Sequence, residues 1–413
     1  MKDLLSRLKS MFGGGAEPAE RTAAAPAVAG TRTDPSVGSP IGAHVDAPVA
    51  ALADTPASIP ASTLNPSATS SDMVLVNAYC TVGILPPMSF PHGDVARRDL
   101  SDPELAGHLE GFVGYISSRG DGQMTSTRYH LIRHVQRVQQ HLSMQIPTTG
   151  LDAFADWALS ANALVFLPDG DIRDPFGRVL MNAAGGPPDP EAIVPYPQDS
   201  WERKARTEAQ LATRGLRVPA HLPPLPGEAE TRLRSPDEVL GRVSALCAVA
   251  FRAKTVYSDD PIPVGELFSR LPHGSDRLTP VEAAFMAAAT PDQETAVELS
   301  WRFECVPVLE WVLGLRDDLP FPDGTVDAPL ALLEMSPEQM AELPLKVQLR
   351  PTSEILDALD LHYRAHWLVR QSRVDNAPPP QGLVPGIVAE RHYALNWLVR
   401  FEDAEWDQVD TPT

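Results

Sequence analysis

Residues 290–314 read TPDQETAVELSWRFECVPVLEWVLG, and this segment carries the strongest structural pattern in the chain. Its start is typical of a helix. Thr290 suits the capping position, Pro291 suits the first helical position, and Gln293 completes a capping box. Its apolar residues recur at helical spacing around most of the circumference, which is typical of a helix buried on most sides. Pro307 is expected to kink this helix near its middle. We therefore predict that the segment forms the central helix of a helical domain.

The same type of helix start occurs repeatedly in the C-terminal part of the chain. Each start has a Ser or Thr, a Pro directly after it, and a Glu or Gln at the third following position. The four starts lie at Ser235, Thr279, Thr290 and Ser336. Further helical patterns run near residues 352–372 and 387–401, and no strand pattern lies between them. Residues 235–413 are therefore predicted to form an all-α domain.

Residues 73–182 show a mixed pattern of strands and helices. Residues 73–82, MVLVNAYCTV, are β-branched and apolar, as expected of a strand. Three helices are predicted, at residues 101–117, 126–144 and 151–164. Ser101 and Glu104 form the capping box of the first of these helices. Residues 163–181 indicate two strands joined by an Asp-Gly turn, so this part is predicted to be an α+β domain.

The remaining segments are predicted to be a short helix, a tether and a connector. Residues 1–12 form a basic amphipathic pattern that could contact a membrane surface or a groove on a partner. Residues 13–72 are rich in Ala, Pro, Ser and Thr and contain no aromatic residue, which predicts a disordered tether. Residues 183–234 are Pro-rich and contain one charged helix near residues 201–215, which predicts a connector.

Charge and cysteine usage limit the function classes. The formal net charge is −20, which disfavours general nucleic-acid binding because an acidic surface gains nothing from a phosphate backbone. The three cysteines are far apart and form no CxxC spacing, so we expect free thiols in a reducing cytoplasm. No Walker, GxSxG or HExxH pattern occurs, and we expect no cofactor.

A set of charged and polar residues in the C-terminal helices forms the candidate site. These side chains belong to helical patterns that are apolar on most sides, so they must satisfy one another if water is excluded. The predicted polar network comprises Arg302, Glu304, Arg350, Glu354, Asp357, Asp360, Arg364, His366, Glu390, Arg391, His392 and Asn396. The pattern does not show whether these groups surround an open space or one another.

Two interpretations of this network remain open. In the first, arginine–carboxylate pairs cross-link the central helices and fix their register. In the second, Arg302, Arg350 and Arg364 bind an anionic ligand, and His366 or a carboxylate acts as an acid or base. An open cavity over these side chains would favour the second interpretation.

Two groups of histidines have spacings that deserve a comparison with metal sites. His362 and His366 are four residues apart on one predicted helix, as in some metal sites, but both fall on its apolar side. The predicted helix at 126–144 places His130, His134 and His141 on one stripe. Arg137 shares that stripe and would repel a cation. We therefore predict core or surface histidines and no metal site.

Several longer motifs of the C-terminal half resemble a known family. They are LRSPDEVL at 233–240, LSWRFE at 299–304, EWVLG at 310–314, EILDALD at 354–360, ERHYALNW at 390–397, Tyr363, Arg364, Trp367, and the closing Trp406, Asp407 and residues 411–413. Together they resemble the bacterial domain-of-unknown-function family numbered 4272, over roughly residues 200–413. The resemblance implies a bacterial, intracellular setting and supports the domain boundary. It implies no function, because that family has no assigned activity.

Two hypotheses of function follow from these patterns. The first is a cytosolic, non-enzymatic module that acts through protein contacts, as an accessory or immunity-type protein would. The second is a hydrolase or transferase that acts on an anionic small molecule in the Arg/Asp/Glu/His network. Substitution of Arg302, Asp360 and Arg364 would separate them, because a structural network unfolds when broken whereas a binding site loses its ligand-induced stabilisation.

Overall fold

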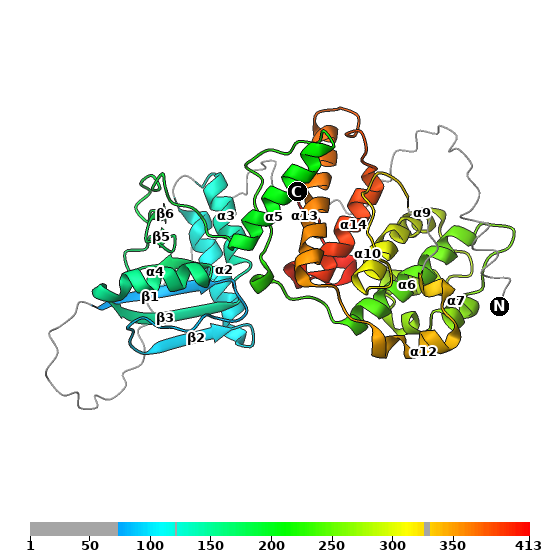
Figure 1. Ribbon diagram of the computed structural model, residues 1–413, viewed down its shortest axis with the longest axis horizontal. Helices are drawn as coiled ribbons and strands as arrows, with labels where there is room; N and C mark the ends of the chain where they lie inside the picture. Colours follow the sequence, from blue (N-terminus) through cyan, green and yellow to red (C-terminus); the bar gives the residue numbers. More distant parts are fainter. Residues whose placement is uncertain (1–72, 120–121, 326–330) are drawn as a thin grey trace, which may run out of the picture. The chain divides into compact units, whose positions relative to one another are not determined.

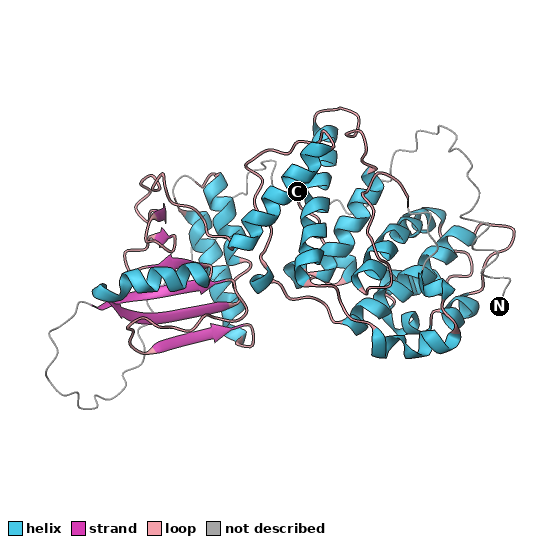
Figure 2. Cartoon of the chain, in the orientation of Figure 1, coloured by secondary structure: helices cyan, strands magenta, loops and turns pink. Residues whose placement is uncertain are grey.

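The computed structural model describes residues 73–119, 122–325 and 331–413 (Figures 1 and 2). The predicted helix at residues 1–12 and the predicted tether at residues 13–72 lie outside the described residues. Within the described parts, none of the helices combines the length and the hydrophobicity that crossing a membrane requires.

An antiparallel sheet forms the first part of the described chain. Its strands are β1 Met73–Cys80, β2 Val95–Asp99, β3 Gln140–Pro147, β4 Ala163–Phe166, β5 Ile172–Arg173 and β6 Val179–Met181. They are ordered β2-β3-β1-β4-β5-β6. β1 pairs with β3 along its whole length, from Met73 opposite Pro147 to Cys80 opposite Gln140. Because β1 and β2 both run antiparallel to β3, their C-terminal ends lie at the same end of the sheet, beside the start of β3.

Helices cover the two faces of this sheet. They are α2 Pro103–Ser118, α3 Ser126–Val135 and α4 Leu151–Ser160 (Figure 1). Alternate residues of β1 enter two separate cores, as the twofold repeat of a strand requires. Val76 packs in the core that contains Trp157 of α4. Tyr79 packs in the other core, with Phe112 of α2 and Leu131 of α3.

The predicted helix at 126–144 was wrong in its second half. α3 ends at Val135, and β3 occupies Gln140–Pro147 between β1 and β2. Two neighbouring strands satisfy the backbone of β3 on both of its edges, and this pairing outweighs the local helical pattern. The cap of α2 was also shifted, because Asp102 rather than Ser101 accepts the hydrogen bond of the first turn, from the Glu104 N–H at 2.9 Å.

The region that was predicted to be an all-α domain is helix-rich, and no strand follows β6 in the described residues. The helices after β6 are α5 Gln198–Thr213, α6 Pro236–Thr255, α7 Val264–Arg270, α8 Pro280–Ala287, α9 Gln293–Trp301, α10 Cys305–Val312, α11 Ala331–Glu334, α12 Pro337–Lys346, α13 Thr352–Val374 and α14 Pro385–Leu398. The predicted caps at Ser235, Thr279 and Ser336 are confirmed, because each hydroxyl accepts the N–H of the third following residue. Thr290 is not a cap, since Asp292 begins α9 by accepting from Thr295 at 2.8 Å.

The segment 290–314 is two helices rather than one. A 3₁₀ turn at Arg302–Glu304 separates α9 from α10, four residues before the kink that the sequence suggested at Pro307. A proline ring removes one helical donor and crowds the carbonyl four residues earlier, which accounts for the break at Phe303. All eight residues of α10 are buried.

α6 occupies the centre of the helix-rich region. Fifteen of its 20 residues are buried, and it packs against α9 and α10 among others. Gly274 lies directly on the backbone of α6, so that a Cβ at this position would come within 2.6 Å of the Ala245 nitrogen. Only glycine allows the chain to approach α6 this closely.

Candidate functional site

The first group of predicted network residues joins α13 to α5. Arg364 and Asp360, four residues apart on α13, form a two-point ion pair with both N–O distances at 2.9 Å. Arg364 also donates to Glu208 of α5 at 3.4 Å and to the Pro223 carbonyl at 3.2 Å. Neither Arg364 nor Asp360 is more than 1% exposed. The pair is therefore enclosed between α13, α5 and the segment that follows α5.

Asp357 belongs to the same contact between α13 and α5. It accepts a hydrogen bond from Arg206 at 2.8 Å and lies 3.4 Å from the guanidinium of Arg203, which is buried. The sequence analysis grouped these charges with Arg302, Glu304 and Arg350 and did not identify α5 as their partner. The helix predicted as part of a separate connector supplies the partners instead.

A second group joins α14 to the 3₁₀ turn between α9 and α10. Arg302 pairs with Glu390 at 2.9 Å, and Arg391 pairs with Glu304 at 3.3 Å. The Arg391 guanidinium also donates to the Pro320 carbonyl at 2.8 Å. Burial raises the pKa of Glu304, and the attraction of Arg391 opposes this shift. These pairs agree with the predicted cross-link between central helices.

The remaining network residues form separate contacts. Arg350 pairs with Glu354 at 3.2 Å and donates to the Trp311 carbonyl at 2.7 Å, at the end of α10. Asn396 donates to the Asp410 carbonyl at 2.8 Å. The twelve predicted residues thus occupy one region of the fold, but they form several closed groups rather than one continuous network.

His366 of α13 and His392 of α14 form a buried imidazole pair. Their Nδ1 atoms lie 2.9 Å apart, so one ring donates and the other accepts. Burial lowers the pKa of His366 to about 4, and burial lowers the pKa of His392 well below its usual value. Both rings are therefore neutral at pH 7, where they connect two helices.

The histidines considered for metal binding make other contacts in the fold. His362 donates from Nδ1 to the Ala358 carbonyl, at 2.7 Å, within its own helix. His134 lies on α3 next to the Tyr79 carbonyl, whereas His141 lies on β3 beside Asn77, so the predicted stripe with His130 was wrong. Among the residues that the structure describes, no group of three or more His, Cys, Asp or Glu side chains is arranged to hold a metal ion.

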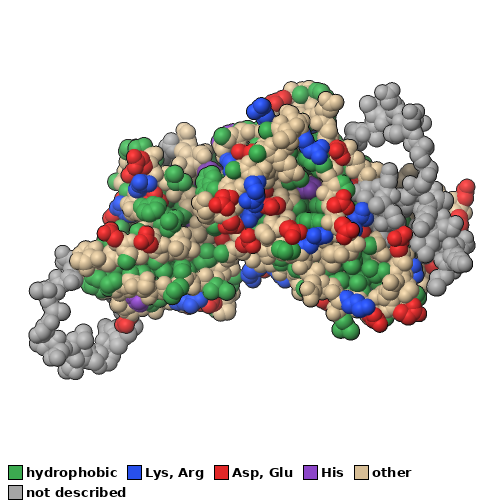
Figure 3. All heavy atoms as spheres, viewed as in Figure 1, with side chains coloured by type: hydrophobic (Ala, Val, Ile, Leu, Met, Phe, Trp, Pro, Cys, Tyr) green, Lys and Arg blue, Asp and Glu red, His purple; other side chains and the backbone are tan. Residues whose placement is uncertain are grey.

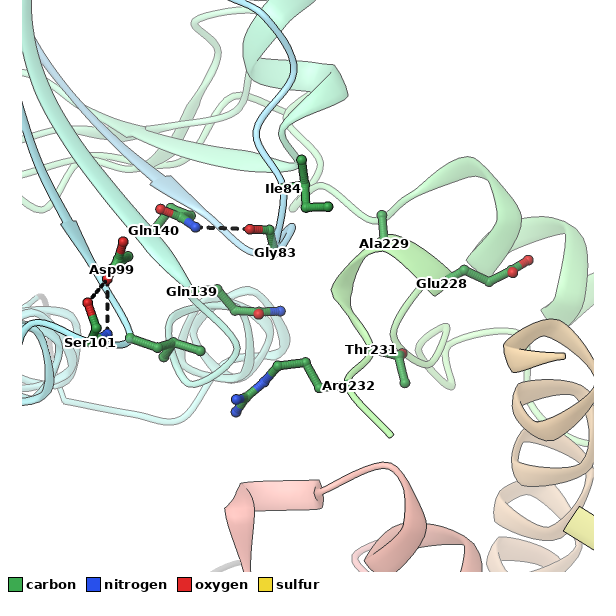
Figure 4. A pocket seen from close by; sticks show the side chains of 11 residues that line it. Gly83, Ile84, Asp99, Ser101, Gln139, Gln140, Glu228, Ala229, Thr231 and Arg232 are labelled. Atoms are coloured by element: carbon green, nitrogen blue, oxygen red, sulfur yellow. Dashed lines mark hydrogen bonds between the residues drawn. The ribbon is translucent and has the colours of Figure 1, made fainter. Parts of the chain in front are cut away.

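A cavity of about 550 Å³ lies away from these groups, at the end of the sheet (Figure 4). It is lined by the segments that follow β1 and β2, by the start of β3, and by residues 228–232. Figure 4 shows Asp99 and Ser101 on one side and Glu228, Ala229 and Thr231 on the other, with Arg232 extending between them. None of the twelve predicted network residues lines this cavity.

The connector is held at this cavity by a polar cluster around Glu230. The Glu230 carboxylate, which is buried, accepts from Arg137 at 2.8 Å, from Asn162 at 3.1 Å and from the Gly227 N–H at 2.6 Å. Its main-chain carbonyl accepts from Gln139 at 2.6 Å. The sequence interpretation did not identify this cluster, because its members are spread over three separate segments of the chain.

Residues 203–409 match the model of a family described as Domain of unknown function (DUF4272). The chain belongs to this family. The match begins within α5, whose arginines pair with Asp357 of α13, so the matched region includes most of the helix that we predicted to be part of the connector. No curated protein and no solved structure matched the chain.

A second, smaller cavity of this DUF4272 protein lies at the start of α6. It measures about 310 Å³ and is lined mainly by charged and polar residues, including Asp237, His273 and Arg277. Arg277 is paired with Asp237 at 2.5 Å, and His273 contacts the Met340 carbonyl at 2.9 Å. Its polar side chains are therefore engaged with neighbouring groups, and the cavity at the sheet end is the larger candidate.

Two exposed apolar side chains, Ile84 and Leu100, line the larger cavity. Ile84, which lines it, is 90% exposed, the highest value of any large apolar side chain in the described residues. Leu100, on the opposite segment, is half exposed. Elsewhere, Figure 3 shows acidic and basic side chains interspersed on the face that it presents, without a large patch of one sign. Nothing in the sequence pattern marked Ile84, because exposure depends on the packing of distant segments.

Proposed function

We propose that this DUF4272 protein is a protein-interaction module that holds a segment of a partner protein in the cavity beside Ile84. The observation that carries the proposal is the exposure of Ile84 and Leu100 on two sides of a cavity of about 550 Å³. Large apolar side chains that flank a concave surface gain free energy when a partner covers them. Cavities of this volume also fall within the usual range for ligand pockets.

The enzymatic alternative has less support. A hydrolase or transferase acting on an anionic substrate would need arginines of the network to face an open space. These arginines are instead paired with carboxylates: Arg302 with Glu390, Arg391 with Glu304, and Arg364 with Asp360 of its own helix. His366, the proposed acid or base, has a lowered pKa and is hydrogen-bonded to His392. The geometry therefore favours a structural role for the network.

We also propose that the protein acts in a reducing compartment such as the cytoplasm. The three cysteines, Cys80, Cys247 and Cys305, are buried and free. Burial raises the pKa of each thiol, which keeps it protonated and unreactive. Such thiols are typical of proteins that fold where disulfides do not form. The net charge of −20 supports protein partners over nucleic acids.

The test compares which proteins bind to two variants, each with a substitution at an equally exposed apolar position. Ile84→Asp places a charge at the cavity, whereas Leu345→Asp alters a side chain that is 89% exposed on α12. The full-length chain and both variants are used to recover proteins from the source cells, with quantification by mass spectrometry. We expect some proteins to be recovered with Leu345→Asp and not with Ile84→Asp. A purified protein of this set should bind Leu345→Asp with a lower Kd than Ile84→Asp.

Two results would count against the proposal. Recovery that is equal for Ile84→Asp and Leu345→Asp would place the contact surface elsewhere. A small-molecule anion that raises the Tm of the wild type, and not that of Arg302→Gln, would favour the enzymatic alternative.

A further inference from the structure

Arg232 is a cation at the mouth of the cavity that has no partner in the described parts of the chain. Its side chain lines the cavity and extends toward the side formed by Ser101 (Figure 4). Nearby arginines are engaged, since Arg97 donates to Gln140 at 2.9 Å and Arg137 pairs with Glu230 at 2.8 Å. A guanidinium left unpaired beside apolar side chains is complementary to a carboxylate that arrives with apolar surface.

The other charges at the cavity limit how acidic this occupant can be. Asp99 and Glu228 also line the cavity. The Asp99 carboxylate accepts from the N–H of Ser101 at 3.0 Å and from its hydroxyl at 2.6 Å, which fixes a negative charge there. The chain as a whole carries a net charge of −20. A segment with several acidic residues would be repelled, whereas one carboxylate placed at Arg232 is tolerated.

The cavity walls favour an apolar side chain next to that carboxylate. Ile84 and Leu100 supply apolar surface on two sides, and the volume of about 550 Å³ accommodates the largest side chains. When the last residue of a protein chain is apolar, its side chain and a single carboxylate are attached to the same Cα. An internal acidic residue would need a second, apolar residue beside it.

We propose that the cavity binds the carboxyl-terminal residue of a partner protein, with a large apolar side chain between Ile84 and Leu100 and the terminal carboxylate at Arg232. This inference rests on the proposed function, because it names the part of the partner that enters the cavity. Recognition then depends on one ion pair and on apolar burial.

The experiment measures peptide binding to the full-length protein by fluorescence anisotropy. The probes are fluorescein-labelled hexapeptides of Gly and Ser that end in Phe or Leu, each with a free carboxyl terminus or as the matched amide. We expect the free acids to bind about fivefold more tightly than the amides, as one partly exposed ion pair allows. In Arg232→Gln this preference is lost while the affinity for the amides is unchanged. Arg232→Lys keeps part of the preference for the free acid, and Ile84→Asp weakens the binding of both the acid and the amide peptides.

The outcomes separate this inference from the proposed function. Equal affinities of acid and amide for the wild type, or a preference that survives in Arg232→Gln, would overturn the carboxyl-terminus inference. If no hexapeptide binds but a purified partner protein still discriminates against Ile84→Asp, the interaction module stands and the inference fails. If neither the peptides nor any protein responds to Ile84→Asp, both fail. The Tm of each variant is measured first, and Arg232→Gln is expected to match the wild type because Arg232 is exposed.

Discussion

The ion pair between Asp360 and Arg364 provides the sharpest test of whether the predicted network is structural. Asp360 is 1% exposed and Arg364 is fully buried, and two N–O contacts of 2.9 Å join them. Removing one partner leaves the other charge buried without compensation, which typically costs about 3–5 kcal/mol. Substitutions at the two positions therefore report directly on how far water is excluded.

The structure ranks the two substitutions. After Asp360→Ala, Arg364 still has Glu208 at 3.4 Å and the Pro223 carbonyl at 3.2 Å, so the expected loss is about 3 kcal/mol. Arg364→Met leaves Asp360 without its two-point partner and removes both links to the α5 region, so about 4–5 kcal/mol is expected. The double variant should lose less than the sum, with a coupling of about 2 kcal/mol.

The assay is guanidinium denaturation of the full-length chain, followed by tryptophan fluorescence. Trp367 of α13 and Trp397 of α14 lie in the region that unfolds. Arg206→Ala is the control, because this side chain pairs with Asp357 on the same helix but is 57% exposed, and less than about 1 kcal/mol is expected. Losses below about 1 kcal/mol for both Asp360→Ala and Arg364→Met, with no coupling in the double variant, would refute the argument that these charges are enclosed.

Three further predictions concern other parts of the fold. Glu230→Ala removes the buried acceptor that fixes the connector, so we expect a loss of about 3 kcal/mol and faster hydrogen exchange at the Gly83 N–H, which donates to this segment. Because the pKa of His366 falls from about 6.5 unfolded to about 4 folded, the unfolded state binds more protons between these values. Stability therefore falls as pH drops from about 6.5 to 4, and His366→Gln should reduce the slope by up to roughly 1.4 kcal/mol per pH unit. Gly274→Ala should cost about 2–3 kcal/mol by forcing a Cβ onto the backbone of α6, whereas Gly265→Ala, which meets no atom within 4 Å, should not destabilise the protein.

Each of these predictions has a result that contradicts it. Unchanged exchange at Gly83 in Glu230→Ala would mean that the carboxylate does not hold the connector. The same pH slope in wild type and His366→Gln, measured by denaturation at several pH values, would mean that the imidazole pair is solvated. Equal Tm values for Gly274→Ala and Gly265→Ala would mean that α6 does not approach this turn.

Local chemistry explains why several helix starts were predictable from the sequence. A serine or threonine cap acts on the N–H three residues later, so Ser235, Thr279 and Ser336 could be recognised without knowledge of the fold. At the fourth start the predicted cap was Thr290, but Asp292 caps α9. The carboxylate of Asp292 accepts from both the N–H and the hydroxyl of Thr295, which gives it the advantage.

The strand β3 shows how tertiary pairing overrides a local pattern. Leu142 fits both the helical repeat that begins in α3 and the alternation of Leu142, Met144 and Ile146, whose side chains are buried in the sheet core. The sequence contained both patterns. Pairing with β1 and β2 on either side decided between them, and neither partner is adjacent in sequence.

The candidate site was predictable only in part. The sequence indicated that Asp360, Arg364 and Arg391 would be enclosed, and the structure buries all three. It could not indicate their partners, because the periodicity of one helix says nothing about which helix faces it. The cavity at Ile84 and Arg232 was missed for a similar reason, since it is formed by segments that are about 150 residues apart in sequence.

The most direct test of the central claim compares the binding of a partner protein by two variants. Ile84→Asp changes the cavity, and Arg302→Gln changes the ion network. The quantity measured is the Kd of a purified partner for each full-length variant, after both have been shown to be folded. A cavity that serves as the contact surface predicts a weakened Kd for Ile84→Asp and an unchanged Kd for Arg302→Gln. The reverse pattern, with binding lost in Arg302→Gln and retained in Ile84→Asp, would contradict it.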